Sequence, residues 1–113
     1  MENLDTRTKI LPWAQFVKTD GPVISGYFDP LTVEHSTRLE ELAAAHGPLC
    51  IAIYDPDRPL LPAEARAALV ASLACVKAVS IAAGEIPITA DLRAEDLERR
   101  ERMMAHVHSR HGR

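Results

Sequence analysis

A short apolar segment, a glycine turn and an amphipathic helix follow one another between residues 22 and 46, and this succession constrains the fold most strongly. The segment at residues 22–25 is short and largely apolar, which is typical of a buried strand. Beyond the turn, apolar or aromatic side chains recur at i, i+4, i+7, i+8 and i+11, which is the spacing of one helix face: His35, Leu39, Leu42, Ala43 and His46. Thr32 precedes this helix, where its hydroxyl can accept a hydrogen bond from a free backbone N–H group.

The start of this helix is suited to binding an anion. Its first turn presents unpaired backbone N–H groups and the positive end of the helix dipole, which together can hold a phosphate group. His35 lies on the face expected to turn toward the sheet, near the carboxyl end of the preceding strand. Ligands bind at that edge in open α/β sheets. The sequence therefore predicts an anion pocket near Thr32 and His35.

The following segments continue the alternation of helix and strand. Gly47 and Pro48 end the first helix, and residues 49–54 form a nearly continuous apolar run typical of a buried parallel strand. Pro62 begins a second helix, and residues 76–82 give a third strand. We expect a Rossmann-like three-layer α/β/α sandwich with a small parallel sheet and a long C-terminal helix.

The length of 113 residues suits one domain. We divide it into a leader at residues 1–20, a βαβαβ core at 21–83 and a C-terminal amphipathic helix within 84–113. The aromatic segment at 10–17 either packs over the sheet as a short helix or turn, or forms a wall for a base or a partner chain. We favour the first alternative, because lone aromatic residues in small domains usually supply burial.

The C-terminal segment is rich in charge from residue 91 to about 109, after a proline-broken stretch at 85–89 that is either an edge strand or an extended link. Leu97, Met104 and Val107 form a narrow apolar stripe on the expected helix. This stripe either covers the sheet or pairs with a second copy, so we expect a homodimer. We interpret the terminal histidines as solvated side chains and expect no metal site: His106, His108 and His111.

Net charge bears on the class of partner, and cysteine content bears on the compartment. The formal net charge of −3 gives no general attraction to nucleic acid or to an anionic membrane, and we expect neither as a partner. Cys50 and Cys75 have no metal-type spacing. They are either reduced thiols or a disulfide, and we favour buried, reduced thiols in a cytoplasmic protein.

The turn also carries a resemblance. The pattern Gly26-x-Phe28-Asp29-x-x-Thr32-x-x-His35 resembles the signature of the cytidylyltransferase-like nucleotidyltransferases, whose pattern ends in His-x-Gly-His or Thr-x-Gly-His. The similarity covers about the middle half of the chain. It is greatest to the branch that contains the nucleotidyltransferase domain of ADP-heptose synthase. In that family the first His or Thr and the second His contact the nucleotide phosphates, so the resemblance implies catalytic roles for Thr32 and His35. It also implies nucleotide contacts from the turn: Gly26, Tyr27, Phe28 and Asp29.

The resemblance further implies transfer of a nucleotidyl group from CTP or ATP to a small-molecule acceptor, with release of pyrophosphate. Mg²⁺ would be held mainly by phosphate oxygens. Two features depart from the family pattern. Glu34 stands where the signature has glycine, and the second signature, an Ile-Ser-Ser/Thr-Thr-x-x-Arg run, is absent.

Two arginines are further candidates for phosphate binding. Arg58 lies in a proline-rich loop at the carboxyl end of the second strand, where it either binds an anion or pairs with the neighbouring Asp55 or Asp57. Arg66 begins the sheet-facing side of the second helix. It either points toward the ligand edge or, as we favour, forms a salt bridge with an acid in the preceding loop.

Two functions follow from these observations. The first is nucleotidyl transfer, or nucleotide binding with weakened or lost transfer. The second is a non-catalytic dimeric module of the same fold that serves regulation or subunit interaction. Glu34 and the missing second signature favour the second function slightly.

Overall fold

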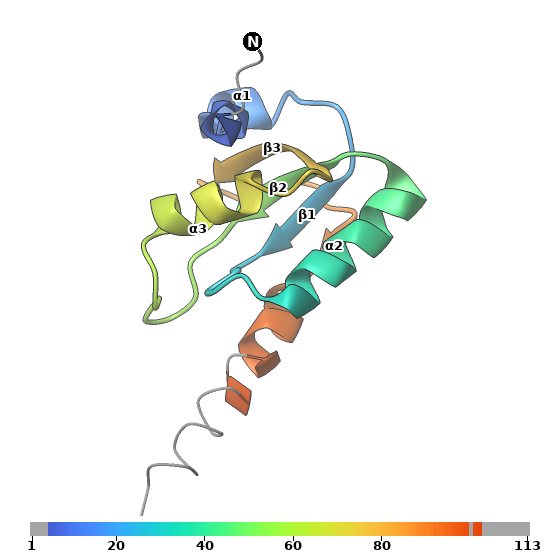
Figure 1. Cartoon of the computed structure of the whole chain (residues 1–113). Coiled ribbons are helices and arrows are strands. Elements are labelled where there is room, and N and C mark those ends of the chain that lie inside the picture. Colours follow the sequence, from blue (N-terminus) through green and yellow to red (C-terminus); the bar gives the residue numbers. More distant parts are fainter. Residues whose placement is uncertain (1–4, 100, 103–113) are drawn as a thin grey trace, which may run out of the picture.

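The computed structural model describes residues 5–99 and 101–102. Four parallel strands form one sheet in the order β3-β2-β1-β4 (Figure 1). In chain order they are β1 (Val23–Gly26), β2 (Leu49–Ile53), β3 (Val76–Ile81) and β4 (Ala90–Asp91). The expected Rossmann-like α/β class with a small parallel sheet is confirmed.

Two helices cover one face of the sheet. The helix α2 (Val33–His46) connects β1 to β2, and α3 (Ala63–Ala71) connects β2 to β3. Because both connections step through the sheet in the same direction with right-handed crossovers, both helices lie on the same side. Their apolar residues share one core cluster with alternate residues of β2: Leu39, Leu42, Leu49, Ile51, Ile53, Ala67 and Val70. The bounds predicted for the first helix agree with those observed.

The opposite face is covered by the leader. A short helix, α1 (Trp13–Phe16), buries Phe16 against small side chains of the sheet: Cys50, Ala52 and Ala78. A 3₁₀ helix, η1 (Thr6–Lys9), precedes it, and the Leu11 N–H then donates to the Val79 carbonyl at 2.8 Å. The alternative of a short helix packing over the sheet is therefore confirmed for this aromatic segment.

The C-terminal part differs from our expectation in its first residues. Asp91, predicted to be helical, instead lies in β4, which pairs with the free edge of β1. Backbone N–H groups of Thr89 and Leu92 donate to carbonyls of β1 at 2.7 Å each, which satisfies that edge. Residues 93–99 and 101–102 are helical. The remainder of the expected long helix, including Met104, Val107 and the terminal histidines, lies outside the described residues.

The two cysteines are free thiols, Cys50 buried and Cys75 partly buried. Burial raises the pKa of both thiols. The prediction of reduced, buried thiols therefore holds fully for Cys50 and in part for Cys75. Over the stretches 5–99 and 101–102, none of the helices combines the length and apolar character needed to cross a membrane.

Candidate functional site

The segment for which we predicted an anion pocket lies where β1 ends and α2 begins. The Thr32 hydroxyl accepts the His35 backbone N–H at 3.3 Å, and His35 Nδ1 accepts the Thr32 backbone N–H at 3.0 Å. This reciprocal arrangement is a capping box, with a histidine in the place where glutamate or glutamine usually stands. The expected N-cap is confirmed, and it fixes the orientation of the imidazole.

Close packing explains the glycine at the end of β1. A Cβ atom at Gly26 would lie 2.6 Å from the Phe28 ring and 2.8 Å from the Asp96 carboxylate. Phe28 itself is fully buried and has a φ of 49°, which is uncommon for a residue with a side chain. The turn is therefore shaped to bring its backbone N–H groups against another side chain.

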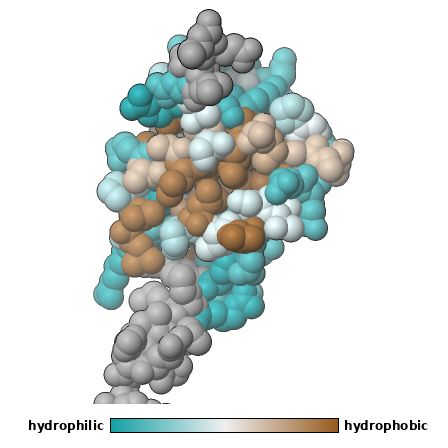
Figure 2. Space-filling view, in the orientation of Figure 1, coloured by the Kyte–Doolittle hydropathy of each residue, from teal (hydrophilic) through white to brown (hydrophobic). Residues whose placement is uncertain are grey.

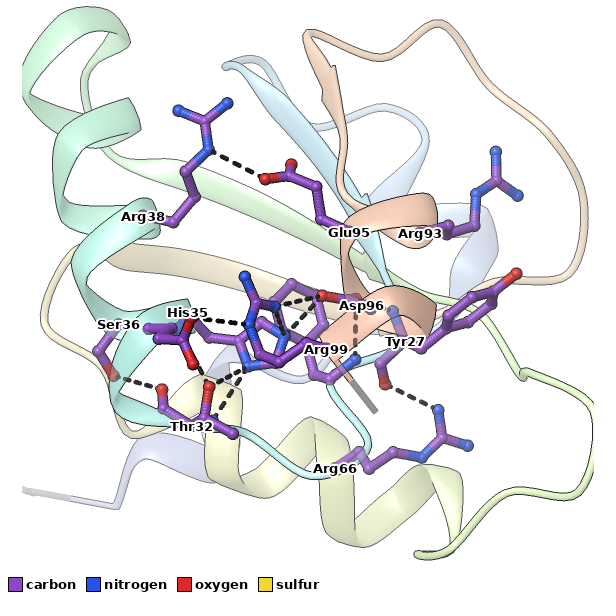
Figure 3. Close-up of polar contacts among 12 residues, drawn as sticks. Tyr27, Thr32, His35, Ser36, Arg38, Arg66, Arg93, Glu95, Asp96 and Arg99 are labelled. Atoms are coloured by element: carbon purple, nitrogen blue, oxygen red, sulfur yellow. Dashed lines mark hydrogen bonds and ion pairs between the residues drawn. The ribbon is translucent and has the colours of Figure 1, made fainter. Parts of the chain in front are cut away.

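His35 is buried, with 3% of its surface exposed, and faces the carboxyl edge of the sheet. Its Nε2 lies 2.6 Å from Asp96 Oδ1 (Figure 3). Because Nδ1 accepts a backbone N–H group, the proton belongs on Nε2, which therefore donates to Asp96. Arg99 Nη1 lies 3.1 Å from the same Nε2. Both atoms carry hydrogens, so we count this as a van der Waals contact and not as a hydrogen bond.

Asp96, from the C-terminal helix, is the centre of the site. Its Oδ2 accepts the backbone N–H groups of Tyr27 at 2.7 Å and Phe28 at 3.2 Å. Its Oδ1 accepts His35 Nε2–H and also lies 3.3 Å from Arg99 Nη1. Four donors, two of them on adjacent residues of the turn, thus converge on one buried carboxylate, and they stabilise a charge that would otherwise be costly to bury.

Our sequence reasoning missed Asp96 and Arg99. The helical spacing contains one usable signal, because Leu92, Asp96 and Arg99 occupy i, i+4 and i+7 and therefore share a face. Leu92 is buried in the main core, so the polar residues that follow it on that face also point toward the domain.

Glu34, which replaces the signature glycine, lies at the rim of the site. Its side chain is 66% exposed, and its carboxylate is 3.5 Å from Arg99 Nε. The Nε atom is buried and makes no hydrogen bond, so this ion pair is its nearest compensation. The donors of the turn and of His35 are directed at the Asp96 carboxylate and not at Glu34.

Asp29 holds the neighbouring loop. Its two carboxylate oxygens accept the backbone N–H groups of Leu60 at 2.7 Å and Leu61 at 2.8 Å. This loop carries Arg58, which is exposed and has a φ of 53°. Asp29 is thus buried and engaged with the protein, and it also lines the pocket described below.

Arg66 is fully buried beneath the same edge. Its guanidinium donates to the carbonyls of Leu61 at 3.0 Å, Tyr27 at 3.0 Å and Tyr54 at 2.9 Å. It also forms a salt bridge with Asp55. The alternative that we favoured, a salt bridge with an acid of the preceding loop, is therefore confirmed, and four of the five guanidinium N–H groups are used within the protein.

A small pocket opens above these groups. Its volume is about 20 Å³, which is space for about one water molecule. It is lined by Tyr27, Asp29, Pro30, Thr32, His35, Pro56, Asp96, Leu97 and Arg99. Four predicted site residues therefore meet at one pocket. The other four do not line it: Gly26, Phe28, Arg58 and Arg66.

Metal binding is restricted by the hydrogen bonds of the carboxylates. Within the part of the chain that the structure describes, no group of three or more His, Cys, Asp or Glu side chains is arranged to hold a metal ion. Asp29 and Asp96 already accept backbone N–H groups. A magnesium ion at this site would accordingly take most of its ligands from phosphate and water.

No protein-family model matches this chain, and no curated protein matches it either.

Proposed function

We propose that the chain is a nucleotide-binding protein related to the cytidylyltransferase-like nucleotidyltransferases, with weak or lost transferase activity. The observation that supports this proposal most is the convergence of the Tyr27 N–H, the Phe28 N–H and the His35 Nε2–H on one anionic group. A site of this kind is built to stabilise negative charge, and a nucleotide phosphate is the anion that the sequence resemblance implies.

The same geometry argues against efficient transfer. Both ring nitrogens of His35 already have partners, and Arg66 is committed to backbone carbonyls. Loss of one preorganised donor commonly lowers the rate of such a reaction by about 10²–10³-fold. Nucleotide binding with little turnover is the combination that this arrangement favours, and Mg²⁺ would accompany the nucleotide through its phosphates.

Titration calorimetry with ATP and with CTP, each with and without Mg²⁺, tests the proposal. We expect heat with at least one nucleotide, and its loss in His35→Ala. The matched control is His46→Ala, because His46 lies exposed at the other end of the same helix. Absence of heat with both nucleotides, or equal losses in the two variants, would refute nucleotide binding at this site.

A pyrophosphate-release assay with small phosphorylated or hydroxylated acceptors separates weak transfer from none. Turnover that His35→Ala abolishes would establish an active nucleotidyltransferase. Persistent absence of pyrophosphate in the presence of bound nucleotide would leave a binding protein.

The second candidate is a homodimeric interaction module in the cytoplasm. Figure 2 shows apolar residues gathered across the middle of one face, with hydrophilic residues around them. Among the described residues, the exposed large apolar side chains lie on several different elements and loops: Val17, Val33, Leu60, Leu69 and Leu97. Exposed apolar area of this kind favours association. Analytical ultracentrifugation over a hundredfold concentration range tests it, and a mass of one chain of 12.4 kDa throughout would exclude the dimer.

A further inference from the structure

The anion site of this protein is filled by a carboxylate of its own chain. Asp96 receives the two backbone N–H groups of the glycine turn and the His35 Nε2–H, at 2.7, 3.2 and 2.6 Å. These donors surround the two oxygens of the carboxylate much as they would surround two oxygens of a phosphate group. A phosphate and the Asp96 carboxylate cannot occupy this place together, because both are anionic and both need the same donors.

The helix that carries Asp96 is held mainly by polar contacts. Among its described residues 93–99, none belongs to either apolar core cluster, and Leu97 is 38% exposed. The remaining contacts are polar. The strong ones are the hydrogen bonds that Asp96 accepts, which a bound phosphate would accept in its place. The ion pair Arg38–Glu95 at 3.9 Å is exposed on both sides and therefore weak. Segments with few buried apolar contacts open at low free energy.

A pivot exists at the start of this helix. Leu92 is buried in the main core, and its N–H donates to the Ser25 carbonyl at 2.7 Å. Arg93 pairs with Asp91 at 2.9 Å and Glu85 at 3.3 Å, and its guanidinium lies over the Tyr54 ring. None of these contacts involves Asp96, so the helix beyond Arg93 can leave the site while its first residues remain attached.

We propose that Asp96 is an internal competitor for the phosphate site, and that a nucleotide phosphate binds by displacing Asp96 and the helix beyond Arg93. This inference rests on the proposed nucleotide binding and adds a mode of regulation to it. In the closed state the chain holds its own anion. In the open state the Tyr27 and Phe28 N–H groups and the His35 Nε2–H bind the phosphate, and Arg99 leaves with Asp96 because both belong to the same helix.

The closed state lowers the apparent affinity of the site by the fraction of molecules that are open. Asp96→Asn removes the charge that competes with phosphate while nearly preserving the size of the side chain. The matched control is Glu95→Gln, the same change of charge on the adjacent residue of the same helix, whose carboxylate faces Arg38. We expect ATP to bind Asp96→Asn at least about tenfold more tightly than the unaltered protein, and Glu95→Gln within about twofold of it.

Titration calorimetry supplies these dissociation constants, with ATP and inorganic pyrophosphate as the two probes. Tightening with both probes identifies the phosphate group as the competitor, whereas tightening with ATP alone would assign the effect to the base or sugar and overturn the inference. Equal affinities in the unaltered protein and Asp96→Asn would also overturn it while leaving nucleotide binding intact. No binding to any variant would remove both the proposed function and its regulation.

Hydrogen exchange on the unaltered protein gives a second measurement, which decides the matter even if Asp96→Asn fails to fold. Saturating ATP should speed exchange of the backbone amides of residues 96–99, which begin the hydrogen-bonded part of the helix with the bond from Asp96 N–H to the Leu92 carbonyl. It should leave the amides of Tyr27 and Phe28 protected, because the phosphate replaces the carboxylate as their acceptor. Unchanged or slower exchange in residues 96–99 with ATP bound would show that the helix stays in place and would overturn displacement.

Discussion

Replacement of Arg66 offers the sharpest test of how the ligand edge is held together. The guanidinium is fully buried and donates to three backbone carbonyls, those of Tyr27, Tyr54 and Leu61. These carbonyls belong to the segments that follow β1 and β2 and to the loop before α3. Arg66→Met keeps most of the apolar stem but removes every donor, so it isolates the polar contribution.

The expected loss can be estimated from the groups left behind. A buried acceptor without a partner costs about 1–3 kcal/mol, and three carbonyl acceptors lose their donor in this variant. Water can reach some of them once the guanidinium is gone, so we expect a total of about 3–5 kcal/mol rather than the full sum. Asp55 is 62% exposed and contributes little to this total, because a solvated carboxylate loses its partner at small cost.

Urea denaturation followed by circular dichroism measures the free energy of unfolding. Domains of this size have about 5–15 kcal/mol in total, so Arg66→Met should shift the midpoint far toward low urea. The comparison variant Asp55→Asn removes the carboxylate while the buried guanidinium keeps its three carbonyl acceptors, so it should cost less than Arg66→Met, about 1–2 kcal/mol. Arg66→Lys should fall between the two, because one ammonium group cannot match the planar fork of donors.

Two results would contradict this reasoning. An Arg66→Met variant within about 1 kcal/mol of the unaltered protein would mean that the carbonyls are readily hydrated. Equal losses in Arg66→Met and Asp55→Asn would mean that the ion pair, and not the set of carbonyls, is the stabilising contact.

Three further predictions concern single residues. Gly26→Ala places a Cβ atom 2.8 Å from the Asp96 carboxylate, so it should destabilise the fold by about 1–3 kcal/mol in thermal melts; an unchanged melting temperature would show that the turn can yield. The hydrogen bond from Arg93 lowers the pKa of Asp91 from 3.8 to about 2, so the stabilisation from Asp91 is complete above pH 4 and lost as the pH falls from about 4 to 2. Because the Asp91 side chain is 40% exposed, the loss should be below about 1 kcal/mol and absent in Asp91→Asn, which urea titrations at pH 5 and pH 2.5 can measure. Burial raises the pKa of the Cys75 thiol, so iodoacetamide at pH 7 should modify it more slowly than a free cysteine, and faster modification would contradict the partly buried environment.

Local signals explain which parts of the fold the sequence could predict. The helix α2 has the predicted bounds because both ends have strong local signals, a threonine cap at Thr32 and a Gly47-Pro48 stop. The strand β4 could not be found in this way. It has two residues, too few for any periodicity, and it forms because the free edge of β1 lies beside it.

The candidate site divides along the same line. Thr32 and His35 meet as predicted because they lie three residues apart in one helical turn. Asp96 is 61 residues from His35 in the chain, so its arrival depends on the whole topology. A charge-rich segment usually indicates a solvated face, and one buried acid within such a segment is visible only once Leu92 fixes which side of the helix points inward.

Three buried charged residues at this edge of the sheet show why a motif alone leaves function open. The charged groups of three residues form hydrogen bonds with backbone groups of the protein. Asp29 accepts N–H groups of the loop, Arg66 donates to carbonyls at the strand ends, and Asp96 accepts N–H groups of the turn. A phosphate would be bound by the same kinds of hydrogen bond, so residue type cannot separate a ligand contact from an internal tie. A ligand contact and an internal contact differ in whether the partner can be exchanged for a molecule outside the chain. At Arg66 the partners are backbone carbonyls that cannot leave without unfolding the edge. At Asp96 the partner is a side chain on a helix with little apolar anchorage, and exchange for an external anion there is physically accessible.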